Sequence, residues 1–198
     1  DYRIGVVPVY DSKYLNDKTV YKPSGLRKMN PLGELVPLKG LENADSSTAP
    51  ALYITRETPN PKEVLKQTVM IGVQWGPEAE ESFSPVLAVT EEQRNQEINQ
   101  GFYQQDAYLA VIFLTDADDV TPGLSAEEFY QKLVDLKGGD RSKVLIAAAL
   151  PNLENHSAGC EKDGRGPIQA FPSLMAISSG IQADLCSKNF GVTLAEFG

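Results

Sequence analysis

The sequence predicts an α/β fold: a mostly parallel sheet flanked by helices. Residues 107–114 form a continuous apolar run, and residues 143–150 are apolar after Lys143; both segments have the length and composition of strands. Residues 125–137 lie between them and show the apolar spacing of a helix, and a second helical segment follows at 170–179. Because a strand, a crossover helix and a second strand normally pair in parallel, we expect one sheet covered by helices. The run at 107–114 is typical of a central strand buried on both faces.

The first half of the chain predicts two short strands and a helix around a long insertion. Residues 2–10 are rich in β-branched and aromatic side chains, which favour a strand, and residues 51–55 favour another. Residues 11–50 are polar with scattered Pro and Gly, so we expect a long irregular connection there. Asn60 suits the N-cap of the following helix, and Glu63 suits its N3 position.

Three further signals fix the remaining elements. Residues 78–89 predict a helix with acidic residues in its first turn. Ser125 and Glu128 have the spacing of a capping box, and Gly138 suits the end of the helix that they begin. Residues 151–198 begin as a loop and contain both cysteines. We expect a single domain over residues 1–198.

Composition excludes several classes of function. The chain of 198 residues has 18 Lys and Arg against 27 Asp and Glu, a formal net charge of −9. No basic cluster is present, so nucleic acid and acidic membrane surfaces are not expected as partners. The single histidine, His156, excludes a zinc site with two imidazoles. No apolar run has the roughly 20 residues that a membrane span needs.

Three carboxylates follow the strand expected at 107–114. Asp116, Asp118 and Asp119 would lie at the carboxyl end of a parallel strand, where open α/β sheets bind ligands. Clustered carboxylates suit a hard cation such as Mg²⁺ or Ca²⁺. The alternative is structural: one aspartate caps the following loop, and the others face water.

Several segments in order resemble a von Willebrand factor A-type domain, in the subgroup found in bacterial exported proteins and lipoproteins. The segments are residues 1–7, 54–60, 72–76 and 101–119. The resemblance implies a doubly wound, Rossmann-like sheet and a metal-ion-dependent adhesion site, in which an acidic side chain of a protein partner completes the metal shell.

The resemblance assigns only part of that adhesion site to this chain. Asp116 matches the aspartate of the family's third metal loop, and Glu80 matches a glutamate that the subgroup carries in its second loop. Asp118 and Asp119 would tune the charge of the site. No D-x-S-x-S motif occurs, and residues 1–10 resemble the family's second strand. We therefore expect an upstream segment of a precursor to supply the first strand, or the sheet to close in another order.

The resemblance also bears on partner binding and on the cysteines. Trp75 and Glu78 lie beside the second loop and are candidates for a partner-binding rim, although a packed core position suits Trp75 better. Cys160 and Cys186 could form one disulfide or remain two buried thiols. The subgroup carries a similar bonded pair, which implies an oxidising compartment: the periplasm, the cell surface or the medium.

Three functions are consistent with these features. The first is an extracytoplasmic protein-binding module with a partial metal-ion-dependent adhesion site, and it is not an enzyme. The second keeps the fold without the metal, as a structural scaffold of an envelope assembly. The third is a metal-assisted hydrolase in which Asp116–Asp119 activate water.

Overall fold

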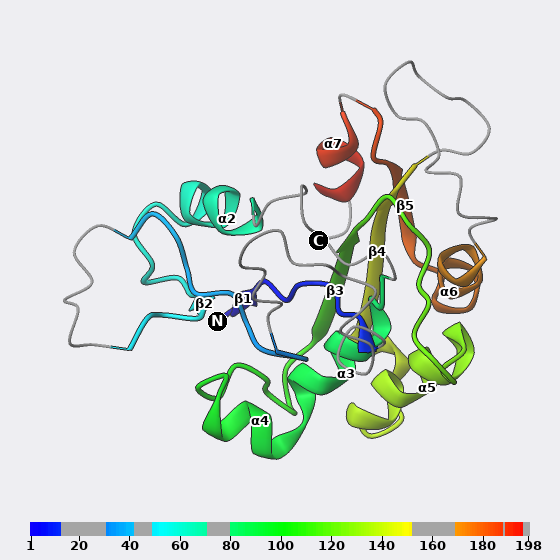
Figure 1. Cartoon of the computed structure of the whole chain (residues 1–198), viewed down its shortest axis with the longest axis horizontal. Helices are drawn as coiled ribbons and strands as arrows, with labels where there is room; N and C mark the ends of the chain where they lie inside the picture. The colour runs from blue at the N-terminus through cyan, green and yellow to red at the C-terminus, as the bar shows by residue number, and fades with distance from the viewer. Residues whose placement is uncertain (13–30, 42–48, 71–79, 152–168, 188, 196–198) are drawn as a thin grey trace, which may run out of the picture. The chain divides into compact units, whose positions relative to one another are not determined.

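A computed structural model describes residues 1–12, 31–41, 49–70, 80–151, 169–187 and 189–195 (Figure 1). The chain divides into two compact units, residues 1–104 and residues 105–198, and each is described by itself. This division does not test whether either unit folds alone, so a single domain over 1–198 stays a prediction. Most of the expected insertion at 11–50 lies outside the described residues.

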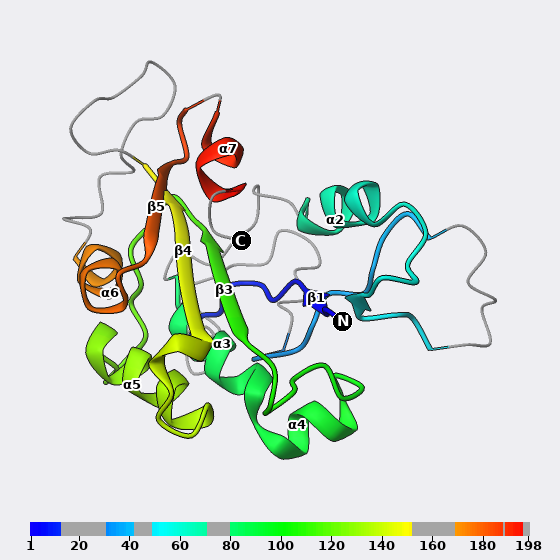
Figure 2. The same cartoon turned by 180° about the vertical axis from the view of Figure 1, so that it is seen from behind.

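The second unit contains a parallel sheet of three strands in the order β3-β4-β5 (Figures 1 and 2). The strands are β3 (Leu109–Leu114), β4 (Val144–Leu150) and β5 (Ile181–Asp184). Leu109 pairs with Val144 at the start of the first ladder. The prediction of a mixed α/β fold with a parallel, helix-flanked sheet is confirmed at this level, which is compatible with a Rossmann-like fold.

Helix α5 (Ala126–Leu136) begins as the sequence predicts. The Ser125 hydroxyl accepts a hydrogen bond from the Glu128 amide at 3.2 Å, and the Glu128 carboxylate accepts one from the Ser125 amide at 2.9 Å. Both halves of the capping box are therefore formed, which satisfies two N–H groups at the helix start. A short 3₁₀ helix, η1 (Arg141–Lys143), then leads into β4.

One face of the sheet is buried by aromatic packing. The Phe113 ring of β3 meets Phe129 of α5 edge-on at 6.1 Å between centroids, and Phe171 of α6 (Ala170–Ser178) at 5.1 Å. Phe129 and Phe171 have no solvent-exposed surface. Rings of this size contribute much of the apolar burial in a small core, so they hold α5 and α6 onto this face.

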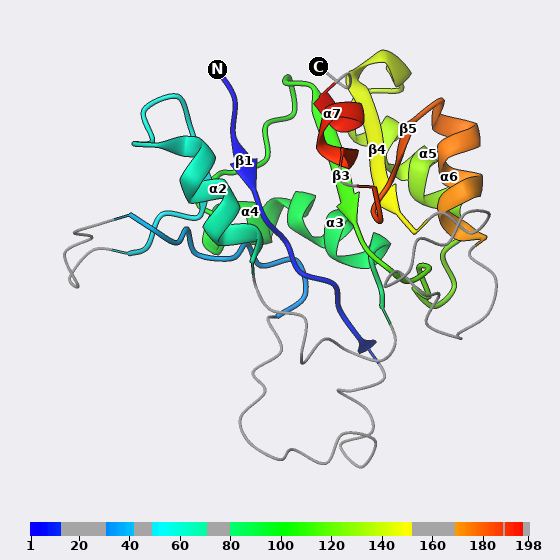
Figure 3. The ribbon, with the colours of Figure 1, turned by 90° about the horizontal axis from the view of Figure 1, so that it is seen from above.

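The other face of the sheet is covered only in part. Helix α7 (Phe190–Ala195) lies on the opposite side from α5 and α6 (Figure 3), and Ala147, Ala149 and Ala183 are buried on that face. On β3, however, Ile112 and Leu114 are each 50% exposed. The prediction that this strand is buried on both faces is therefore wrong, because it lies at the edge of the described sheet.

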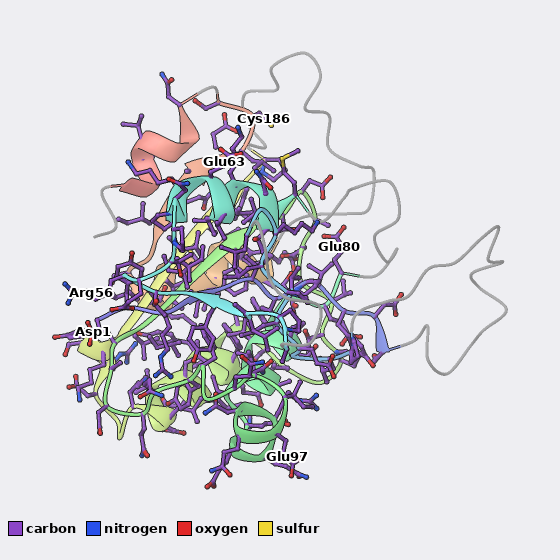
Figure 4. The ribbon with its side chains drawn as sticks, turned by 90° about the vertical axis from the view of Figure 1, so that its left-hand side faces the viewer. Asp1, Arg56, Glu63, Glu80, Glu97 and Cys186 are labelled. Atoms are coloured by element: carbon purple, nitrogen blue, oxygen red, sulfur yellow. The ribbon has the colours of Figure 1, made fainter. Side chains whose placement is uncertain are left out.

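The first unit has one small antiparallel sheet. Strand β1 (Ile4–Gly5) pairs with β2 (Tyr53–Ile54), so only two residues of the strand expected at 2–10 are regular. Arg56, just after β2, forms an exposed ion pair with Asp1 at 3.5 Å (Figure 4). An exposed pair of this kind contributes little stability.

The described part of the first unit also contains helices α2, α3 and α4. Helix α2 (Pro61–Val69) begins where the sequence predicts, but the Asn60 side chain makes no capping hydrogen bond and its backbone is left-handed, with φ of 47°. Helix α3 (Phe83–Thr90) begins later than the helix expected at 78–89, and its Pro85 lies in the first turn, where no N–H donor is needed. Helix α4 (Glu92–Glu97) was not predicted, because it is polar throughout and buries no residue.

One cluster in the core of the first unit lies beside a segment that is held by a buried amide. Leu35, Leu52 and Val89 are buried together. The Asn99 side chain, which is fully buried, accepts a hydrogen bond from the Leu35 amide at 3.1 Å and donates one to the Gly33 carbonyl at 2.9 Å. It therefore satisfies the N–H group of Leu35 and the C=O group of Gly33, which lie outside the regular strands.

Replacing Ser125 with Ala should lower the free energy of unfolding by about 1 kcal/mol, because the α5 capping box loses an acceptor. Hydrogen bonds from Ser125 lower the pKa of the Glu128 carboxyl. The ionised Glu128 carboxylate therefore stabilises the helix start at pH values above the usual carboxyl pKa. This contribution is lost as the pH falls through the lowered pKa of Glu128. Urea unfolding at several pH values measures both effects. A loss for Ser125→Ala that is the same where Glu128 is ionised and where it is protonated would contradict this assignment.

Candidate functional site

Asp116, Asp118 and Asp119 lie in one loop at the carboxyl end of β3, which we call the aspartate loop. Asp118 holds this loop to helix α6. The Asp118 carboxylate accepts hydrogen bonds from the amides of Gln169 at 2.7 Å, Ala170 at 3.0 Å and Phe171 at 3.3 Å. These amides are the otherwise unsatisfied donors at the start of α6, where a negative charge also interacts favourably with the helix dipole. Asp118 therefore has a structural role as the cap of α6.

Asp119 is also engaged within its own loop. One carboxylate oxygen accepts from the Thr121 amide at 3.0 Å, and the other accepts from the Thr121 hydroxyl at 2.8 Å. The residue is buried, so these hydrogen bonds compensate for the loss of water around the charge. Asp119 and Thr121 together form the turn that directs the chain away from β3.

Asp116 is the exposed member of the three. Among the described residues, no group makes a hydrogen bond or an ion pair with its carboxylate. Mg²⁺ and Ca²⁺ need several oxygen ligands, usually six or more. The described part of the chain holds no group of three or more His, Cys, Asp or Glu side chains placed to bind a metal. The loop alone therefore does not provide a fitting ligand set for either ion.

The other predicted site residues lie in the first unit or outside the described residues. Glu80 belongs to the first unit and is half-buried. Its neighbour Glu81, which the sequence did not single out, is 3% exposed and accepts hydrogen bonds from the Ser12 amide at 2.7 Å and the Ser84 hydroxyl at 3.0 Å. Four sequence candidates lie outside the described residues: Trp75, Glu78, His156 and Cys160.

Cys186 follows β5 and is bonded in a disulfide (Figure 4 labels it). The chain has one other cysteine, Cys160, which lies outside the described residues. The Cys160–Cys186 pairing stays a prediction. The Cys186 amide donates to the Asp184 carboxylate at 2.9 Å, which fixes the turn that presents the cysteine.

The amino end of the sheet carries a buried cation. Lys137, at the end of α5, is buried, and its ammonium group donates to the Gln105 carbonyl at 3.1 Å, just before β3 begins. Burial lowers the pKa of this lysine. The position suits a cation because it meets the negative end of the α5 dipole. The aspartates lie at the other end of β3, so this charge is no part of their loop.

The feature that the sequence did not reveal is the outer edge of β3. The Thr115 amide donates to the Ala149 carbonyl at 3.3 Å, which extends the ladder with β4 by one step. Backbone groups of alternate residues point to opposite sides of a strand, so Val111 and Phe113 face β4 as Thr115 does. The residues whose N–H and C=O groups point away from β4 are Ala110, Ile112 and Leu114.

We call these three residues the outer row. Among the described residues, no strand pairs with the outer row, since β3 has β4 as its only neighbour in the sheet. The side chains of the row share one face, on which Ile112 and Leu114 are half exposed, as is Leu145 of β4 at 38%. No alternation in the sequence marks this face, because every residue from Leu109 to Leu114 is apolar.

Comparisons with protein families, with curated proteins and with solved structures found no match for this chain. The resemblance to von Willebrand factor A-type domains therefore stays a proposal. Among the described residues, no helix is both long and apolar enough to cross a membrane.

Replacing Asp118 with Ala should lower the free energy of unfolding by roughly 1–2 kcal/mol, because three amides lose their acceptor. Asp118→Asn keeps one acceptor oxygen and should cost less. Asp116→Ala is the matched control and should leave stability unchanged. Thermal unfolding in EDTA measures the stability of all three variants. A loss of stability for Asp118→Ala that appeared only when Mg²⁺ or Ca²⁺ was present would favour metal binding over capping.

Proposed function

We propose that this chain is a protein-binding module that acts without a metal ion, as a structural component of an extracytoplasmic assembly. Its fold is proposed to be the doubly wound sheet of von Willebrand factor A-type domains. The observation that carries the proposal is the outer row of β3, whose backbone donors and acceptors pair with no strand in the described part of the chain and lie beside a half-exposed apolar face. Such an edge is suited to protein partners rather than to small ligands.

The contacts of the aspartate loop favour the scaffold over the metal-dependent form of the module. Asp118 and Asp119 stabilise α6 and a turn, and these roles account for two of the three acidic side chains. Only Asp116 among them has a carboxylate that is exposed to an incoming ligand. A metal-assisted hydrolase needs a cation held by several ligands, and no observation on the described residues favours one.

The proposed compartment rests on the disulfide at Cys186. Disulfides persist in oxidising surroundings and are rare in reducing ones. We therefore infer an exported protein located in the periplasm, at the cell surface or in the medium. The excess of acidic over basic residues in the chain is consistent with a partner other than nucleic acid.

Titration calorimetry with Mg²⁺ and with Ca²⁺ tests the proposal, together with turnover of a panel of phosphoesters. We expect no heat of specific binding at millimolar metal, no shift of the melting temperature between metal and EDTA, and no turnover. Metal binding that Asp116→Ala abolishes would restore the adhesion-site hypothesis. Turnover that the same substitution abolishes would make the chain a hydrolase and overturn the proposal.

A further inference from the structure

We draw no further inference here: the strongest candidate, the cluster of buried acidic side chains that Asp11 and Glu81 form beside Tyr10 ahead of helix α3, carries nothing, because the Glu81 carboxylate is engaged by the Ser12 amide and the Ser84 hydroxyl and no second observation on the described residues points to a ligand.

Discussion

The constraint on which the account depends is backbone hydrogen bonding along β3. Each strand of a sheet has two rows of N–H and C=O groups, and a row without a partner must find one elsewhere. The row of β3 that includes Val111 and Phe113 is paired with β4, and the outer row is not paired with any described strand. The apolar side chains beside the outer row make solvent a poor partner for that face. The proposed function follows from this imbalance.

The arrangement of the aspartate loop shows how one sequence pattern can serve structure rather than ligand binding. Asp118 caps α6 through three amides, and α6 in turn places Phe171 against Phe113 under the sheet. Asp119 closes the turn that precedes α5. The carboxylates therefore hold together the face of the sheet that is buried. Only Asp116 is exposed for an electrostatic contribution at the end of β3.

The sequence predicted the elements that local chemistry determines. The capping box at Ser125, the apolar run of β4 and the start of α2 are set by neighbouring residues, so pattern alone found them. The exposed face of β3 was not predictable, because Leu109–Leu114 reads the same whether one face or both are covered. The capping role of Asp118 was missed for a similar reason. The amides that donate to its carboxylate lie about fifty residues away in the chain.

Hydrogen exchange at single-residue resolution along β3 measures whether the outer row is free to pair with a partner. The amides of Val111 and Phe113 should be protected, since they face β4. Those of Ala110, Ile112 and Leu114 should exchange rapidly in the isolated chain. Protection of the outer row in the isolated chain would contradict the proposed function, because it would show that the chain itself already covers this edge.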